Sequence, residues 1–547
     1  MIFQHPKTVE IPSNVTLPEF VFGTKNAYNT IPGNLDADAF IDGDTREKLT
    51  HRQLRELTDK VASGLFNKFN LRRGDCIAIF TPNSIMFPIV FMGALSLGVI
   101  VTTINPMYTE KEVSHQLKDS KAKMIFSYEK GLEVSINSVK QIQKECKIVS
   151  LGKCIAGSIP LSDVYSDKSY QKLSFKSDSE SKGEVALLAY SSGTTGLPKG
   201  VLTTHYNLIS NLIQSECLFG DTIHTGLTAS GILPFFHCYG IMINMLLGMH
   251  TFLRSVVIPK LDFEKFLGII EKDKVELLSL APPVILLLAN SPLVEKYDLS
   301  SIKFIVSGAA PLPLAVGKAA MQRLGCSVTQ GYGMTEASPV ITMTPPSAKQ
   351  VESVGILVPN VKAKIVDPES GKSLGVDEVG ELWVNGPNIM KGYYNNLKAT
   401  QDMFDSENYM RTGDVGYFDK NTHLHIVDRV KELIKYKGYQ IAPAELEEVL
   451  LTHPKVKDCC VIGVPDKATG EELAKGFVVL DVKDTLNKSQ ELAILREIKE
   501  ASHKKLAPYK HFRGGIDAID VIPKSATGKI LRRLLRDQEV KRRQAKL

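Results

Sequence analysis

Short apolar runs that end in turns rich in Gly, Ser and Thr recur along the middle of the chain. Runs at 185–189, 304–306 and 327–329 lead into turns at 190–196, 307–311 and 330–336. Such runs predict buried strands, and the segments between them predict helices. Strands that alternate with helices form parallel α/β sheets, which bind ligands at the carboxyl ends of their strands. We therefore predict one composite pocket built from these three turns.

The pattern changes toward the C-terminus. Pro443, Ala444 and Glu445 have the composition of a helix start, with proline and an acid in the first turn. Beyond them, apolar runs predict strands at 459–464 and 476–482, and charged periodic segments predict helices at 490–505 and 530–543. This mixture predicts a small α+β domain over 431–547, behind a larger α/β domain over 1–430.

One uncharged stretch, 84–105, is long enough to cross a bilayer. Pro88, Gly93 and Gly98 interrupt it, and its last third is rich in β-branched residues. We therefore predict a buried helix that runs into a buried strand, and no transmembrane segment.

Composition and charge narrow the function classes. A chain of 547 residues is too long to fold around one compact core. A composition of 43% hydrophobic and 23% charged residues is typical of globular proteins. The net charge is +6, but residues 501–547 carry 13 Lys and Arg against 4 Asp and Glu. This distribution excludes a broad nucleic-acid-binding face and leaves two readings of the basic end, contact with an anionic ligand or plain solvation. The 8 cysteines lack metal-ligand spacing, which predicts a reduced intracellular protein.

The run 191–200 has the composition of a phosphate-binding loop. Its glycines free the backbone, its hydroxyl and N–H groups can surround phosphate oxygens, and Lys199 adds a positive charge. It is not a Walker loop, because no Gly-Lys-Ser/Thr triplet occurs. The alternative is a flexible surface loop. The run's position directly after a predicted buried strand argues against this alternative.

The run 191–200 also resembles the phosphate loop of the adenylate-forming superfamily, which includes acyl-CoA synthetases, 4-coumarate–CoA ligases, beetle luciferases and peptide-synthetase adenylation domains. Further stretches similar to that family's motifs are 233–237, 330–336, 409–414, 428–438 and 523–529. The resemblance covers about 42–533. It implies a large domain of helix-flanked parallel sheets with a barrel-like subdomain, a mobile C-terminal domain, and the ligands ATP, Mg²⁺ and coenzyme A.

The resemblance also assigns residues to the nucleotide. The ATP-binding set it implies is Ser191, Ser192, Gly193, Thr194, Thr195, Lys199, Ala309, Gln330, Gly331, Thr335, Asp414, Arg429 and Lys431. A carboxylate beside a triphosphate needs a cation between them, so Mg²⁺ is expected next to Glu336. The resemblance implies that Glu336 and Thr195 hold this metal. The carboxylate of Asp414 can accept both ribose hydroxyl protons.

The acid is assigned to an apolar segment. His237 lies among aromatic residues, where a lone histidine is often part of the core, but the resemblance places it beside the carboxylate of the acid. The implied acyl pocket consists of Tyr239, Ile243, Ala309 and Met334.

Lysines divide the two half-reactions. Attack of a carboxylate on the α-phosphorus joins two anions, so a cation must bridge them, and Lys529 after a Gly-containing turn is the candidate. By resemblance, Lys431 marks a hinge about which the small domain rotates to admit a thiol. Lys435 then acts in the second step, with Lys260, Lys437 and Gly438 as CoA contacts.

Several functions stay open on these residues. An acid–CoA ligase for a 4-coumarate-like aryl acid comes first, and one for a medium- or long-chain fatty acid follows closely. A luciferase-type oxygenase would have an arginine where this chain has Asn211. A carrier-protein adenylation module and an inactive scaffold complete the set; the presence of Lys199, Glu336, Asp414 and Lys529 argues against the scaffold.

The chain ends in Ala545, Lys546 and Leu547. This tripeptide is similar to the Ser-Lys-Leu address, which predicts a peroxisomal protein recognised by the import receptor.

Overall fold

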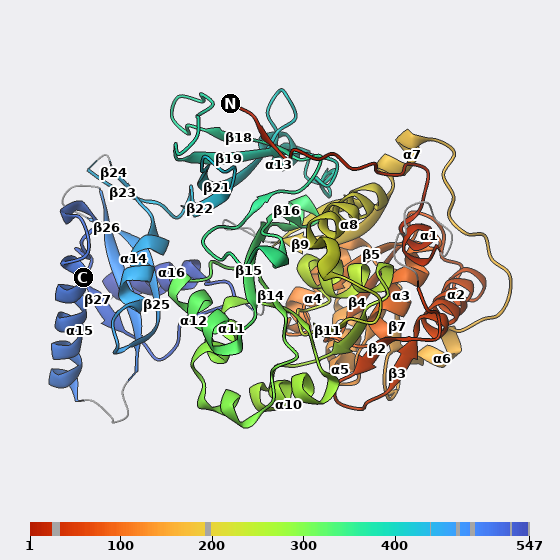
Figure 1. Cartoon of the computed structure of the whole chain (residues 1–547). Coiled ribbons are helices and arrows are strands. Elements are labelled where there is room, and N and C mark those ends of the chain that lie inside the picture. The colour runs from red at the N-terminus through yellow and green to blue at the C-terminus, as the bar shows by residue number, and fades with distance from the viewer. Residues whose placement is uncertain are drawn as a thin grey trace. The chain divides into compact units, whose positions relative to one another are not determined.

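The computed structural model describes residues 1–23, 33–191, 198–437, 439–466, 471–481, 487–525 and 528–544. The chain forms two compact units (Figure 1). The large unit comprises Gln4–Lys362 and Asn385–Met410, and the small unit comprises Met1–Phe3, Ala363–Val384 and Arg411–Leu547. The domain boundary predicted at residue 431 falls inside the small unit and stays a prediction.

A nine-stranded sheet forms one layer of the large unit. Its strands pair in parallel from β15 through β14, β13, β11 and β12 to β2, as the α/β pattern predicts, and three antiparallel strands extend its edges. In spatial order the strands are β17 (Ile356–Leu357), β16 (Val340–Met343), β15 (Ser327–Gly333), β14 (Phe304–Ser307), β13 (Leu277–Leu280), β11 (Thr228–Gly231), β12 (Arg254–Val257), β2 (Asp38–Asp42) and β3 (Lys48–Thr50).

Different helices pack against the two faces of this sheet. On one face, Leu278, Ile305 and Val328 belong to a buried cluster with α10 (Phe263–Asp273), α11 (Pro282–Asn290) and α12 (Leu314–Leu324). The helix η3 (Gly240–Leu247) contacts β11, and α8 (His205–Phe219) contacts both η3 and β16. The middle strands are thus covered on both sides, which explains their continuous apolar sequence.

A second sheet of the large unit has eight strands. In order they are β20 (Gly392–Tyr393), β10 (Lys199–Thr204), β9 (Val185–Ser191), β5 (Ile100–Ile104), β4 (Cys76–Phe80), β6 (Met124–Ser127), β7 (Lys147–Ser150) and β8 (Ile159–Pro160). The other helices of the large unit are α1 (Leu17–Phe22), α2 (His51–Asn67), α3 (Met86–Leu95), α4 (Glu110–Ser120), α5 (Leu132–Ile142), α6 (Leu161–Val164), α7 (Asp178–Gly183), α9 (Gly248–His250) and α13 (Leu397–Met403).

The uncharged stretch 84–105 forms a buried helix, α3, and then the strand β5, as predicted. Along the described parts of the chain, every helix is too short or too polar to cross a bilayer.

The small unit contains three sheets. The strands β1 (Phe3–Gln4), β18 (Lys362–Val366), β19 (Gly380–Asn385), β21 (Met410–Phe418) and β22 (Leu424–Arg429) form the half-barrel that the family resemblance implies. A hairpin of β23 (Ile434–Tyr436) and β24 (Tyr439–Ile441) follows, and then a sheet of β25 (Val456–Pro465), β26 (Glu472–Leu480) and β27 (Ile516–Ala518). The helices are α14 (Pro443–Leu451), α15 (Lys488–His503) and α16 (Arg532–Gln544), which confirms the predicted α+β pattern.

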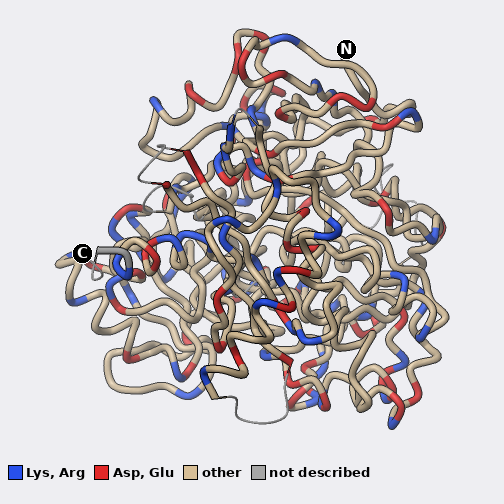
Figure 2. Tube along the Cα trace, turned by 90° about the vertical axis from the view of Figure 1, so that its left-hand side faces the viewer, with Lys and Arg blue, Asp and Glu red and all other residues tan. Residues whose placement is uncertain are grey.

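Lys and Arg are interspersed with Asp and Glu along the described parts of the trace (Figure 2). Several basic residues of the C-terminal segment are already paired. Arg532 contacts Glu447 at 2.7 Å, and the buried Lys475 contacts Asp517 and Glu539 at 2.8 and 2.9 Å. Arg532, for which solvation was one predicted role, is thus a structural residue.

Candidate active site

The predicted phosphate loop connects two antiparallel strands, β9 and β10. Ser191 and Lys199 are register partners at the loop end of this hairpin. The strand before the loop is as predicted, but another strand follows the loop, and the helix α8 begins only at His205. Ser192, Gly193, Thr194 and Thr195 lie outside the described residues.

The side chain of Glu336 joins the two sheets of the large unit at this place. It lies in the turn after β15, is 7% exposed, and its Oε1 accepts hydrogen bonds from the hydroxyls of Ser191 at 3.0 Å and Tyr393 at 2.9 Å. Ser191 ends β9 and Tyr393 lies in β20, so both donors belong to the eight-stranded sheet. The predicted meeting of the turns after residues 189 and 329 is therefore observed.

Tyr393 links this carboxylate to the lysine of the loop. The ammonium of Lys199 lies 4.9 Å from the centre of the Tyr393 ring, within cation–π range. Burial raises the pKa of the Tyr393 hydroxyl well above 10.0, and the neighbouring Glu336 carboxylate raises it further. The hydroxyl thus stays protonated and donates to Glu336.

The turns after β14 and β15 place the remaining nucleotide candidates of the large unit. Ala309 is exposed and has a left-handed φ of 72°, a strained conformation for a residue with a Cβ. The Gln330 side chain donates to the carbonyl of Val351 at 2.7 Å and accepts from the Leu312 amide at 3.2 Å. Gln330 therefore shapes the turn with its side chain. Gly331 and Thr335 are half-buried.

The predicted acid-binding residues lie around the end of β14. The Tyr239 hydroxyl donates to the carbonyl of Val306 at 3.2 Å, and its amide donates to Nδ1 of His237 at 3.3 Å. Cys238 lies 3.6 Å from the hydroxyl of Thr335, and burial raises its pKa to about 12, so it is a neutral thiol. His237, Tyr239 and Thr335 thus lie close together.

Ile243 belongs to η3, which is a π-helix. Such helices are rare and concentrate at functional sites. Gly240 at its start is required, because a Cβ there would lie 2.1 Å from the carbonyl oxygen of Pro234. Ile243 is 4% exposed, and Met334 is half-buried.

The small unit holds the other nucleotide candidates. Asp414 and Arg429 face each other across β21 and β22, and Nε of Arg429 lies 3.0 Å from Oδ1 of Asp414. The carboxylate of Asp414 is buried, and the Thr412 hydroxyl accepts from its amide at 3.1 Å. The pair places an oriented carboxylate beside a guanidinium.

The predicted hinge follows a buried anchor. Oδ1 of Asp428 accepts from the Arg429 amide at 2.7 Å, and Oδ2 accepts from the Ala444 amide at 3.0 Å, in the first turn of α14. Burial raises the pKa of Asp428. Lys431 lies next to this anchor and is exposed.

Three of the predicted CoA-face lysines are exposed. Lys435 lies within β23, and Lys437 directly follows this strand with a left-handed φ of 50°. Lys260 follows β12 in the large unit. Gly438 lies outside the described residues.

Lys529 lies in a turn whose two ends are fixed. Its amide donates to the Ser525 hydroxyl at 3.1 Å, and the Ser525 amide donates to the Lys529 carbonyl at 2.8 Å. Before the turn, Lys524 contacts Asp458 at 2.6 Å; after it, Arg532 contacts Glu447. Its side chain is half-buried.

Asn211, at the position that distinguishes luciferases, is buried. Its amide group donates to the Val340 carbonyl at 2.8 Å and accepts from the Val340 amide at 3.0 Å. It fastens α8 to β16.

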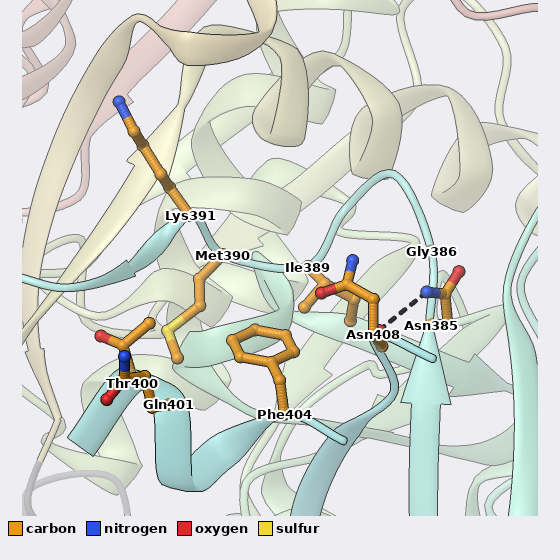
Figure 3. A pocket seen from close by; sticks show the side chains of 9 residues that line it. All are labelled: Asn385, Gly386, Ile389, Met390, Lys391, Thr400, Gln401, Phe404 and Asn408. Atoms are coloured by element: carbon orange, nitrogen blue, oxygen red, sulfur yellow. Dashed lines mark hydrogen bonds between the residues drawn. The ribbon is translucent and has the colours of Figure 1, made fainter. Parts of the chain in front are cut away.

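A separate pocket of about 460 Å³ opens beside α13 (Figure 3). Met390 and Phe404 supply apolar surface, and the Lys391 side chain extends away and donates to the carbonyl of Gly183. No charged group of the described lining is directed into it, so it is unsuited to phosphate. The lining residues are Asn385, Gly386, Ile389, Met390, Lys391, Thr400, Gln401, Phe404 and Asn408.

Sequence reasoning missed Tyr393 and the π-helix. Tyr393 donates to Glu336, which lies 57 positions earlier in the sequence. The segment around Tyr393 carries none of the motifs named above. The position of Tyr393 after Gly392 was the only local signal.

Two family models match the chain. The model of the AMP-binding enzyme matches residues 29–394, and that of the AMP-binding enzyme C-terminal domain matches residues 445–529. The chain is 39% identical to a probable 4-coumarate–CoA ligase of Dictyostelium discoideum over 527 residues, covering 92% of each chain. It is also 39% identical to 4-coumarate–CoA ligase 1 of Petroselinum crispum over 518 residues, covering 92% of this chain and 91% of the relative.

Solved structures share the fold. ATP-bound MatB from Rhodopseudomonas palustris superposes with a TM-score of 0.84 at 24% identity, over 96% of this chain and 99% of that chain. The anthranilate CoA ligase AuaEII in complex with anthranoyl-AMP gives a TM-score of 0.82 at 24% identity, over 96% and 98%.

Replacing Tyr393 with Phe removes one donor to Glu336 but keeps the ring. We expect the free energy of unfolding to fall by about 2 kcal/mol, because the lost bond goes to a buried carboxylate. Since the folded-state pKa of Tyr393 is raised, this contribution is complete below the ordinary tyrosine pKa of 10.0 and is lost as the pH rises above it. Urea unfolding of wild type and variant from about pH 7 to 11 measures the difference.

Ser191→Ala is the matched control, because it removes the other donor to the same oxygen without removing a titratable group. Its stability loss should not vary over this pH range. If wild type exceeds Tyr393→Phe in free energy of unfolding by the same amount at the highest pH as at the lowest, the assigned hydrogen bond from the Tyr393 hydroxyl is contradicted.

Proposed function

Since this chain belongs to the AMP-binding enzyme family and is an ATP-dependent acid–CoA ligase, we propose that it works in two steps. The carboxylate of an acid attacks the α-phosphorus of ATP, which forms the acyl-adenylate and releases pyrophosphate. The thiolate of CoA then attacks the acyl carbon, which forms the thioester and releases AMP. The observation that carries the proposal is the buried Glu336 carboxylate at the root of the phosphate loop.

The first step requires positive charge between two anions. Lys529 supplies it, since its ammonium can lie between the attacking carboxylate and the α-phosphate and stabilise the charge of the transition state. Lys199 binds the departing phosphates. Asp414 accepts hydrogen bonds from the ribose hydroxyls, and Arg429 holds that carboxylate in place.

Mg²⁺ fits the surroundings of Glu336. Oε1 has two hydroxyl donors, whereas no hydrogen bond to Oε2 is found among the described residues, so one oxygen remains for a cation. Groups of three or more His, Cys, Asp or Glu side chains suited to a metal are absent from the described residues. Mg²⁺ sites of nucleotide enzymes are built this way, from one or two carboxylates with phosphate oxygens and water. The ion would neutralise phosphate charge, with Thr195 as the second protein ligand.

The second step uses the other face of the small domain. Rotation about Lys431 withdraws Lys529 and presents Lys435, Lys437 and Gly438, and Lys260 contributes from the large unit. The exposed lysines suit the phosphates of CoA, and a glycine leaves room for the pantetheine arm.

The acid is proposed to be an aryl or cinnamate-like acid. The curated relatives at 36–39% identity include several named 4-coumarate–CoA ligases. The pocket wall of Tyr239, Ile243 and Met334 is uncharged, which suits a flat apolar body. His237 then orients the carboxylate. A medium- or long-chain fatty acid is the alternative.

We expect Glu336→Gln to raise the Mg²⁺ concentration needed for half-maximal pyrophosphate release by at least about tenfold, because a neutral amide is a poorer Mg²⁺ ligand than a carboxylate. Pyrophosphate release titrated with Mg²⁺ at saturating ATP measures this. Glu352→Gln, which neutralises a half-exposed carboxylate of the same unit, is the control and should match wild type. An unchanged titration for Glu336→Gln contradicts the site.

Lys529→Ala should lower adenylation by a factor on the order of 10² to 10³, yet still convert a supplied acyl-adenylate to the thioester. The two half-reactions are measured separately, as pyrophosphate release and as thioester formation. Lys541→Ala removes an exposed charge from the same unit and serves as control. If Lys529→Ala adenylates at the wild-type rate, the division of the two steps is wrong.

We also propose peroxisomal import through Ala545, Lys546 and Leu547, which lie outside the described residues. A fluorescent reporter that ends in these residues should accumulate in peroxisomes, and the same reporter with Lys546→Glu should remain in the cytosol. Equal distribution of the two reporters refutes the address.

A further inference from the structure

The residue before Asp414 has an unusual backbone conformation. Gly413 has a left-handed φ of 72°, which favours glycine. Its amide donates to Oε1 of Glu381 at 3.1 Å, and its carbonyl accepts from the Val430 amide at 2.9 Å. A glutamate side chain thus holds the backbone directly before the carboxylate that is assigned to ATP.

Two successive contacts join the strand β21, which carries Asp414, to the strand β19. The Thr412 hydroxyl donates to the Leu382 carbonyl at 2.7 Å, and the next residue, Gly413, contacts Glu381. As β21 advances by one residue, its partner on β19 moves back by one, as in an antiparallel pair. Of these two contacts, the one with Glu381 lies nearer to Asp414 in the sequence.

The direction of the Asp414 carboxylate depends on this turn. The Asp414 amide donates to the Thr412 hydroxyl at 3.1 Å, so two consecutive amides, those of Gly413 and Asp414, donate to side-chain oxygens. Asp414 is buried, and its Oδ1 lies 3.0 Å from Nε of Arg429. The carboxylate is therefore oriented by the turn on one side and by a guanidinium on the other.

The acceptor of the Gly413 amide is itself a carboxylate. Hydrogen bonds to an ionised acceptor are about twice as strong as those between neutral groups. Glycine has the most conformational freedom of all residues, so its amide needs a strong partner to keep one direction. A half-buried glutamate such as Glu381 supplies that partner.

We propose that Glu381 is a positioning residue for ATP. Through the Gly413 amide it fixes the turn that aims the Asp414 carboxylate at the two ribose hydroxyls. The inference rests on the proposed function, in which Asp414 accepts hydrogen bonds from these hydroxyls. In this scheme Glu381 acts only through the backbone before Asp414.

Loss of Glu381 should affect recognition of the ribose more than recognition of the rest of ATP. A displacement of about 1 Å within a site can lower activity by about a hundredfold. A misdirected Asp414 loses the bonds to the ribose, whereas the triphosphate is bound by other residues. A nucleotide that lacks the ribose hydroxyls should therefore be insensitive to Glu381.

The test compares ATP with 2′,3′-dideoxy-ATP, which lacks both hydroxyls. For each nucleotide, kcat/KM for pyrophosphate release is measured with saturating 4-coumarate or decanoate, whichever wild type activates faster. We expect wild type to prefer ATP by about a hundredfold, which is about tenfold for each hydrogen bond to the carboxylate. In Glu381→Ala this ratio should fall at least about tenfold, because only the value for ATP decreases. A general loss of stability would lower both values and leave the ratio unchanged.

Two further variants of Glu381 sharpen the test. Glu381→Gln keeps an acceptor oxygen and should retain most of the wild-type ratio. Glu381→Leu keeps most of the side-chain volume and removes both oxygens. It replaces the alanine variant if thermal unfolding shows that the alanine variant is unfolded at the assay temperature.

Glu378→Ala is the matched control. Glu378 is an exposed glutamate in the loop between β18 and β19, and its carboxylate also accepts from a glycine amide, that of Gly375. Its removal has the same chemical character but does not touch the turn before Asp414. The control variant should keep the wild-type ratio.

The inference is overturned, and the proposed function stands, if wild type prefers ATP and Glu381→Ala, or Glu381→Leu in its place, keeps that preference. It is also overturned if Glu378→Ala lowers the ratio as much as Glu381→Ala does. If wild type uses both nucleotides equally well, the role of Asp414 in the proposed function fails, and the inference fails with it.

Discussion

One carboxylate fixes the architecture of the large unit's site. Glu336 follows a strand of the nine-stranded sheet, and its two donors, Ser191 and Tyr393, belong to the eight-stranded sheet. The Met390 amide also donates to its carbonyl at 2.8 Å. A buried negative charge is tolerated only with such donors, so the position of the phosphate loop's first residue is tied to the end of β15. The same turn carries Thr335, which contacts Cys238 beside the acid-binding residues.

The electrostatic character of the site changes over a short distance. Around Glu336 the groups are charged or strongly polar, whereas Cys238 and Tyr239 are neutral side chains, and burial raises the pKa of both further. Such a division suits a reaction that joins a triphosphate to the carboxylate of an otherwise apolar molecule.

Local patterns predicted the elements, and long-range contacts escaped prediction. The strands at 185–189, 304–306 and 327–329 and the helix at Pro443 followed from apolar runs and turn residues. The strand β10, which follows the phosphate loop, was not predicted. Its formation depends on pairing with β20, a strand that lies far away in the sequence. The role of Tyr393 depends on its contact with Glu336, which lies far away in the sequence, and no local spacing encodes such a contact.

The fixed turn around Lys529 constrains how the two steps can alternate. The sequence shows only that Lys529 follows a Gly-containing turn. In the structure, Lys524 and Arg532 pair with Asp458 and Glu447, so both ends of the turn are fastened to the C-terminal fold. Displacing the whole turn from the C-terminal fold would break these two partly buried ion pairs, whereas rotating the whole domain would preserve both. The alternation we propose therefore has to occur near Lys431, next to the point where Asp428 already fastens α14.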